Sequence, residues 1–562
     1  MMEKMKIEKS FRRLILIELL FPILLLVLGI YHGFIQVLYR AGVIQSTSFL
    51  GLDYYQGLTL HGVVNAIVFT TFFAVAFGHA LILFYLKKTP HLLFSWISGG
   101  LMVLGTLLAS YAILSGKASV LYTFYPPLKA HPLFYIGATL LVIGSWIAFF
   151  AWIPLYRSWR KENANQKTPL AIVGIFSTFL VWLMATLPLA YEVLVMLIPW
   201  SLGFVPTVNV MLARTLFWFF GHPLVYFWLL PAYIMFYVML PKVSGGKLYS
   251  DFAGRFVFMC FIILSAPVGL HHQFTDPAIR SSWKWFHTVL TFGIAIPSFM
   301  TFFTLCASLE YAAKSRGGTG LLRWWTKLPY FNKDNHEQWL FPYFISGLIL
   351  FSFGGITGLI NASYTMNSVI HNTSWVPGHF HTTVGGPVFL SFIAMSLFMV
   401  ARLLGKEIQF PKLNMWVPYL WMVGVLTFSI GMSVAGIYGV PRRTNLGISY
   451  MTSQPDIFRG LGMLWSNMSV LGGGLMSLSM VFFFFVFITT LCSKKKMEGH
   501  LYFPTSETYY DENISFVQNF KPWIIIAIVL IVIAYGLPLY DVIQATFYGS
   551  AGFTPQSPLP TP

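Results

Sequence analysis

The sequence alternates between long apolar runs and short polar segments, and this pattern repeats along the chain. A helix that crosses the hydrocarbon core of a bilayer needs about 20 apolar residues. Runs of that length predict thirteen spanning helices. They cover residues 14–39, 58–86, 93–115, 132–155, 169–193, 211–240, 254–272, 286–313, 340–360, 376–404, 414–438, 471–493 and 521–545. We therefore predict an all-α, polytopic transmembrane bundle, organised as a single membrane-embedded domain over residues 1–562.

Basic residues are unevenly divided between alternate connecting segments. Lys and Arg collect on the cytoplasmic side of membrane proteins. With the N-terminus placed inside, the inner segments and adjoining helix ends hold 26 of the 35 Lys and Arg, and the outer ones hold 8. This asymmetry predicts a cytoplasmic N-terminus and an outside C-terminus. It also attributes the net charge of +17 to membrane topology rather than to nucleic-acid binding.

Composition supports the same class of protein. Charged residues make up 9% of the chain, whereas soluble proteins carry about 25%. The three cysteines, Cys260, Cys306 and Cys492, are far apart and form no C-x-x-C pair. A disulfide framework and a thiolate metal site are therefore not predicted in this chain.

Six of the 14 histidines share one predicted depth, in the outer half of the bilayer. They are His61, His222, His271, His272, His379 and His381. An ionisable side chain inside a membrane span is costly and is a functional candidate by default. The alternative for any single one is a neutral histidine bonded to a neighbouring helix. Imidazole is the commonest metal ligand and suits iron and copper, so their common depth favours metal binding.

The spacing of these histidines predicts two metal centres. His379 and His381 are two residues apart, which places them about 200° apart around a helix, on opposite faces. On one face, His61 from another span can complete a haem with two axial ligands. On the other face, three further imidazoles can form a copper site with an open position for a small ligand. Those three are His222, His271 and His272.

A tyrosine accompanies the predicted copper ligands. Tyr226 follows His222 by four residues, and positions four apart share one helix face. The phenol is thus expected beside the copper ligand, although an ordinary aromatic stack is the alternative interpretation.

These residues carry a resemblance to a known family. The strings are Leu60-His61-Gly62-Val63, Gly221-His222-Pro223 with Tyr226, Leu270-His271-His272-Gln273, and Val376-Pro377-Gly378-His379-Phe380-His381. Over nearly its whole length the chain resembles subunit I of the haem–copper oxidases, in the ba3-type (family B) branch. Leu224 stands where the mitochondrial-like branch has a glutamate, and the loop after the second span lacks that branch's Asp/Asn-rich motif.

The resemblance implies specific ligands and cofactors. His61 and His381 would ligate a low-spin haem, expected to be haem b, and His379 a high-spin haem of a or o type. His222, His271 and His272 would hold one copper ion. In the family, the tyrosine at the position of Tyr226 is covalently joined to its histidine. It supplies an electron and a proton when the O–O bond breaks.

Polar stripes on two predicted helices indicate a proton path from the inner side. Tyr233 and Tyr237 follow Tyr226 inward, and Ser298, Thr301 and Thr304 recur every three residues on the eighth span. Hydrogen bonds between membrane helices are the structural alternative for such a stripe. In the resembled branch, residues at these positions form the proton channel.

Other polar residues receive simpler interpretations. Arg442 and Arg443 oppose the positive-inside trend, and we expect them to bind haem propionates, with a plain surface loop as the alternative. His371 and Asn367 are expected to join that region. Glu18 and Glu310, near inner helix ends, are interpreted as solvated interfacial charges. His32, His79, His131 and His287 are interpreted as packing or interface residues.

The predicted function is that of the catalytic subunit of a terminal respiratory oxidase of cytochrome c oxidase type, in a prokaryotic cell membrane. It would reduce O2 to water with cytoplasmic protons, and the family implies proton pumping. The expected partners are a subunit II with its own copper site, a small third subunit and a cytochrome c-like donor. Alternatives are a quinol oxidase, a nitric oxide reductase with iron in place of copper, and a non-redox transporter.

Overall fold

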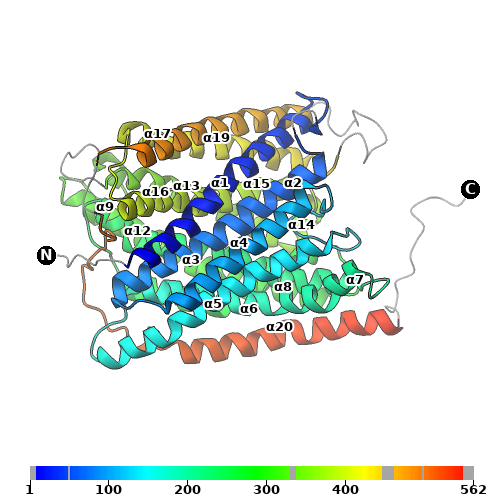
Figure 1. Ribbon diagram of the computed structural model, residues 1–562, viewed down its shortest axis with the longest axis horizontal. Coiled ribbons are helices and arrows are strands. Elements are labelled where there is room, and N and C mark those ends of the chain that lie inside the picture. Colours follow the sequence, from blue (N-terminus) through cyan, green and yellow to red (C-terminus); the bar gives the residue numbers. More distant parts are fainter. Residues whose placement is uncertain (1–7, 49–50, 329–336, 446–460, 496–498, 549–562) are drawn as a thin grey trace, which may run out of the picture.

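The computed structural model describes residues 8–48, 51–328, 337–445, 461–495 and 499–548, and the described chain is helical (Figure 1). Within it, thirteen helical segments are long and apolar enough to cross a membrane, which confirms the predicted number. They are Lys9–Arg40 (α1), Tyr54–Leu86 (α2 to η3), Leu92–Leu114 (α4), Pro132–Glu162 (α5), Leu170–Leu202 (α6 to α7), Val210–Val238 (α8), Asp251–Gln273 (α10 and η5), Ser281–Lys314 (α11 and α12), Leu340–Ala362 (α13), Trp375–Leu404 (α15 to α16), Pro411–Ile437 (α17), Leu464–Cys492 (in α19) and Phe520–Ala545 (in α20). Helices dominate because a backbone in lipid must satisfy its own hydrogen bonds.

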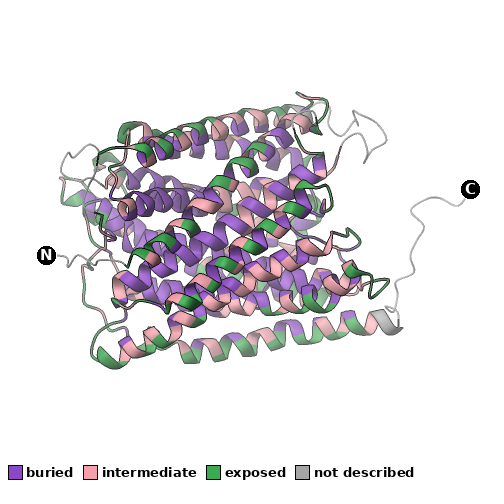
Figure 2. Ribbon diagram, in the orientation of Figure 1, coloured by how far each residue is buried: buried purple, intermediate pink, exposed green. Residues whose placement is uncertain are grey.

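The helices are buried to very different extents (Figure 2). In the most apolar window of α8, 94% of the residues are buried inside the protein, against 28% for α20. Helix α8 is therefore enclosed by other helices, whereas α20 lies along one edge of the bundle, as Figure 1 shows. Large apolar side chains such as Leu24, Val289 and Val532 are exposed on outer helices. In a bilayer this surface faces lipid rather than water.

Two of the predicted ligand helices contain a π-helical turn just beyond their histidines. Helix α2 (Tyr54–Gly62) continues into η2 (Val63–Val68), and α15 (Trp375–Thr383) continues into η7 (Val384–Val388). A π-turn adds a residue to the helical turn and is frequent at functional sites. The extra residue changes the angular position of side chains before the π-turn relative to those after it, so the histidines can face a different direction from the rest of the span.

The seventh span differs from the regular helix expected over residues 254–272. Helix α10 (Asp251–Ser265) ends before Pro267, and the two adjacent histidines lie on a short 3-10 turn, η5 (Leu270–Gln273). The residue before a proline is disfavoured in α-helical conformation, and the proline lacks an N–H donor. His271 and His272 are therefore carried by a turn, whose position depends on its neighbours.

The interpretation of Glu18 as a solvated charge is wrong. Its side chain is fully buried, and its Oε2 lies 3.1 Å from Nδ1 of His79, which is also fully buried. Glu310 is also largely buried, and its Oε2 accepts the N–H of Trp324 at 3.1 Å. A buried carboxylate needs such partners because removing it from water is costly.

Candidate metal and proton-transfer site

Three imidazoles from two elements form a compact cluster. One nitrogen of each of His222, His271 and His272 lies within 4.8 Å of the others, so that a single ion could contact all three. Nδ1 of His222 lies 3.4 Å from Nε2 of His272. Nε2 of His222 is buried and has no hydrogen-bond partner in the described part of the chain. The indole of Trp218 stacks on His272, with ring centroids 3.8 Å apart, and covers one side of the cluster. A set of neutral nitrogen donors of this kind fits copper.

Tyr226 lies beside this cluster, one helical turn inward on α8. Its ring meets that of His222 at an angle of 75°, with centroids 5.0 Å apart. The phenol is buried, and it also contacts the ring of Phe261 at 5.3 Å between centroids. The structure therefore brings together the histidine and the tyrosine that the four-residue spacing predicts as neighbours.

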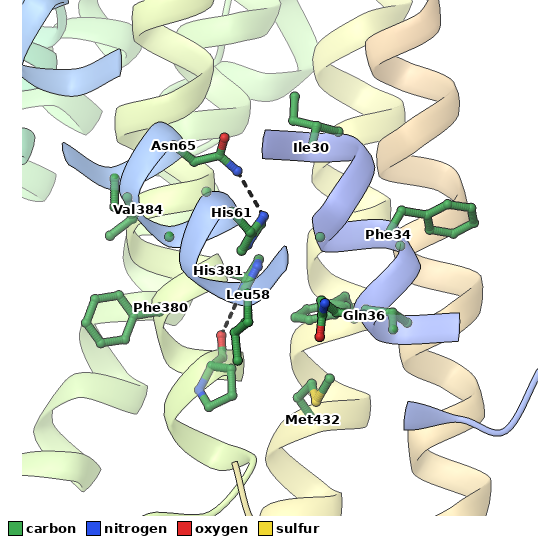
Figure 3. A pocket seen from close by; sticks show the side chains of 18 of the residues that line it. Ile30, Phe34, Gln36, Leu58, His61, Asn65, Phe380, His381, Val384 and Met432 are labelled. Atoms are coloured by element: carbon green, nitrogen blue, oxygen red, sulfur yellow. Dashed lines mark hydrogen bonds between the residues drawn. The ribbon is translucent and has the colours of Figure 1, made fainter. Parts of the chain in front are cut away.

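His61 and His381 face each other across a cavity of about 280 Å³ (Figure 3). Their rings are nearly parallel, at 10°, with centroids 6.1 Å apart. Nδ1–H of His61 donates to the carbonyl of Gly29, and Nδ1–H of His381 donates to that of Pro377, each at 2.8 Å. Metal-bound histidines usually donate their other ring N–H in this way. Since metal–imidazole bonds are about 2 Å long, one iron of a haem fits between the two rings.

Glycines on α1 allow His61 to occupy this position. A Cβ placed on Gly33 would lie 2.5 Å from Nδ1 of His61, and one on Gly29 would lie 2.1 Å from Oδ1 of Asn65. Residues four apart share one helix face, so the two glycines form a flat strip against α2 and η2. Asn65, on η2, also lies 3.0 Å from the His61 ring nitrogen. The approaching atom of Asn65 is its amide nitrogen, Nδ2, which is itself a donor, so with Nδ1–H of His61 donated to Gly29 it packs beside the ring without forming a second hydrogen bond.

His379 points away from the His61–His381 pair, towards α13. Its Nδ1 lies 3.0 Å from the hydroxyl of Thr357. That hydroxyl donates its hydrogen to the carbonyl of Gly354 at 2.9 Å, so it accepts the Nδ1–H of His379. A Cβ on Gly358 would lie 3.0 Å from Cε1 and 3.7 Å from Nε2 of His379, so this glycine leaves space beside the ring. The two histidines of α15 therefore serve different sides, as their spacing predicts.

Arg442 and Arg443 line the same cavity as His61 and His381. Arg443 donates to Thr123 at 3.1 Å, and Arg442 donates to Asn372 at 2.9 Å. Burial, with repulsion from Arg443, lowers the pKa of Arg442 to about 10. Two cations facing one cavity fit an anionic edge such as a pair of haem propionates.

His371 and Asn367 lie near this pair of arginines. Nδ1 of His371 lies 2.8 Å from Oδ1 of Asn367. Burial, followed by repulsion from Arg442, lowers the pKa of His371 to about 4, so this histidine is neutral near pH 7.

The polar stripes on α8 and α12 (Ala295–Lys314) meet between the two helices. The hydroxyl of Tyr237 donates to that of Thr301 at 2.9 Å, and both side chains are buried. Tyr233 lies near Ser298 and Thr301, but its buried hydroxyl makes no hydrogen bond of good geometry among the described residues. Thr304 continues the stripe inward. These hydroxyls can relay a proton along the helix pair.

No hydrogen bond between described residues joins the stripe to Tyr226. The ring of Phe261 touches both Tyr226 and Tyr233, with centroid distances of 5.3 and 5.5 Å. Phe261 therefore packs against both the tyrosine beside the cluster and the first tyrosine of the stripe.

Sequence reasoning missed several residues at these sites. Arg40 lines the cavity and donates to the carbonyl of Pro441 at 2.6 Å, which holds the loop of Arg442 and Arg443. Thr357 and Asn65 also escaped notice, because a single polar residue in an apolar span carries no periodic signal. Only the one-turn spacing of Asn65 from His61 could have indicated its role.

The chain is similar over most of its length to known proteins of one family. The family described as "Cytochrome C and Quinol oxidase polypeptide I" matches residues 13–465. The chain is 40% identical over 497 residues to "Cytochrome c oxidase subunit 1" of Thermus thermophilus, covering 86% of this chain and 85% of that one. It is 30% identical over 234 residues to "Cytochrome c oxidase polypeptide 1" of Halobacterium salinarum, covering 41% and 35%. A solved structure described as a heme-copper terminal oxidase dimer shares 48% identity and a TM-score of 0.93, covering 98% of this chain and 96% of that one.

Proposed function

Because this chain belongs to the family of cytochrome c and quinol oxidase polypeptide I and is the catalytic subunit of a haem–copper terminal oxidase, we propose specific roles for its clustered residues. It is a multi-pass protein of the cell membrane. The proposed branch is the ba3 type, with residues 1–562 acting as one domain. The proposed reaction is the reduction of O2 to water, with protons drawn from the cytoplasmic side and further protons pumped.

The proposed ligands follow from the two histidine groups. His61 and His381 hold a low-spin b-type haem, His379 a high-spin haem of a or o type, and the three-histidine cluster one copper ion. The observation that carries the proposal is the three-histidine cluster within 4.8 Å, with Tyr226 in edge contact with His222. When bound, the metals supply the electron transfer and the oxygen chemistry. Trp218, Phe261 and their neighbours keep this space largely closed to water.

The chain's own residues manage protons. Tyr226 holds a proton at its hydroxyl, beside the cluster where oxygen would bind. Tyr233, Tyr237, Ser298, Thr301 and Thr304 supply protons from the inner side. Arg442 and Arg443 pair with the propionates, which keeps their negative charges within the low-dielectric interior.

Metal analysis combined with an optical spectrum tests this assignment. Two haems and one copper per purified chain are expected. Two haems with a non-haem iron and no copper would instead identify a nitric oxide reductase. A protein without haem would contradict both and favour a transporter.

The electron donor needs a separate test on the complete complex. We propose a cytochrome c-like donor, received through a subunit II that carries its own copper, with a small third subunit. Oxygen uptake with reduced cytochrome c is expected to exceed uptake with a quinol. The reverse order would identify a quinol oxidase.

Replacing Thr301 by valine is expected to slow turnover by about tenfold, because it removes the hydroxyl that accepts from Tyr237 while keeping the side-chain volume. The reduction in turnover rate should grow as the pH rises, because fewer protons are then available to a proton path that is already slow. Oxygen uptake measured between pH 6 and 9 checks this.

A serine at position 301 restores the hydroxyl and should recover most of the rate. Thr178→Val is the matched control, because Thr178 is also buried and bonds its own helix at Gly174, at 2.8 Å, but lies on α6 (Leu170–Tyr191). Equal losses in Thr301→Val and Thr178→Val would remove Thr301 from the proton path.

A further inference from the structure

The backbone of the turn that carries His271 and His272 is hydrogen-bonded to one histidine of α11 (Ser281–Gly293), His287. The backbone N–H groups of Gly269 and Leu270 both donate to Nδ1 of His287, at 3.2 and 3.3 Å. An imidazole nitrogen that accepts hydrogen bonds carries no proton, so the hydrogen of neutral His287 sits on Nε2. His287 is fully buried, which favours this neutral form over the charged one.

The second ring nitrogen of His287, Nε2, connects the turn to α20. Nε2–H donates to the carbonyl of Ala534 in α20 (Phe520–Tyr548) at 2.9 Å. The next residue, Tyr535, stacks on Phe219 of α8 with ring centroids 3.7 Å apart. A Cβ on Gly269 would lie 2.2 Å from the Tyr535 hydroxyl, so this glycine is required for the close approach of α20. The turn is therefore enclosed between α11, α20 and α8.

One helical turn further along α11, Thr291 determines which nitrogen of His271 carries the hydrogen. The Thr291 hydroxyl donates its only hydrogen to the carbonyl of His287, at 2.6 Å. Its 3.2 Å contact with Nδ1 of His271 must then be one in which the hydroxyl accepts. His271 consequently carries its hydrogen on Nδ1 and presents the lone pair of Nε2 for a metal.

We propose that His287 and Thr291 are positioning residues for the copper site. His287 fixes the backbone of the ligand turn against α20, and Thr291 fixes the tautomer and orientation of the His271 ring. Neither side chain contacts a reacting atom. The inference deepens the proposed function, because it rests on the three-histidine cluster being a copper site.

Copper retention in the intact, purified complex tests the role of Thr291. Thr291→Val keeps the side-chain volume but removes the acceptor for His271. During dialysis against a copper chelator, this variant should lose copper about 10- to 100-fold faster than the parent protein, which is the usual cost of losing such a partner. Haem content and thermal midpoint should stay at the parent values. Thr291→Ser restores a hydroxyl and should restore retention.

Thr288 provides the matched control. It lies on the same helix, is also buried, and bonds the carbonyl of Lys284 at 3.0 Å without touching a candidate ligand. Thr288→Val should retain copper like the parent protein. Equal copper loss in Thr288→Val and Thr291→Val would overturn the proposal, because it would reflect general loosening of α11.

Two substitutions separate the functions of His287. His287→Asn places an amide oxygen where Nδ1 accepts from the turn, and it should retain more copper than His287→Leu, which removes both hydrogen bonds. If the parent protein binds copper and both Thr291→Val and His287→Leu retain copper as well as it does, the positioning roles are excluded. The proposed function would still stand in that case. A parent protein with haem but no copper would instead overturn the proposed function, and this inference with it.

Discussion

Tyr226→Phe is expected to reduce steady-state oxygen consumption by at least about 100-fold while leaving the metal content unchanged. The substitution removes only the hydroxyl, and the ring keeps its contacts with His222 and Phe261. Loss of a proton donor positioned at the reacting group typically costs a factor of about 100 to 10,000 in rate. Oxygen-electrode turnover, with haem and copper measured on the same sample, checks this result.

Tyr343→Phe is the control for this experiment. Tyr343 is fully buried on α13 and donates to Asn414 at 2.8 Å, away from the candidate site. Removing that hydroxyl should cost about 1 kcal/mol of stability and leave turnover near the parent value. If Tyr226→Phe turned over like Tyr343→Phe, the phenol would have no catalytic role.

His61→Leu is expected to remove one of the two haems and to abolish electron delivery to the copper site. The substitution takes away the ring nitrogen that faces His381 and also the hydrogen bond to Gly29. Of the two facing imidazoles, only His381 would remain to hold the proposed low-spin haem. The haem-to-protein ratio should fall by half, and reduced-minus-oxidised spectra should lose the low-spin bands.

His131→Asn provides the comparison for His61→Leu. His131 precedes α5, and its Nδ1 accepts the N–H of Leu133 at 3.3 Å, a helix-capping role that asparagine can also fill. This variant should keep both haems and normal turnover. A His61→Leu protein that still binds two haems with unchanged low-spin bands would exclude His61 as a ligand.

Hydropathy predicted the thirteen spans because lipid imposes a strong local rule. Every backbone polar group in a span must be paired within the helix, so an apolar run of sufficient length has one stable conformation. The i to i+4 spacing of His222 and Tyr226, and the two-residue spacing of His379 and His381, are equally local. Their relative directions on a helix therefore followed from the sequence.

Contacts between distant segments could not be predicted in the same way. Glu18 and His79 are 61 residues apart, and nothing in either neighbourhood marks the other as its partner. The end of α10 at Ser265 also escaped prediction, since the apolar run continues beyond it and hides the effect of Pro267. His287 resembled a packing residue because its partners, Gly269 and Ala534, are backbone groups that any sequence would provide.

The hydrogen bond between His287 and Ala534 has a consequence for biosynthesis. The turn with His271 and His272 leaves the ribosome long before residue 534, so its support on the α20 side is missing while the intervening helices are being inserted. Copper delivered at that stage would meet a loosely held pair of imidazoles. Metal loading should therefore follow insertion of α20, and chains cut short before residue 520 should recover haem more readily than copper.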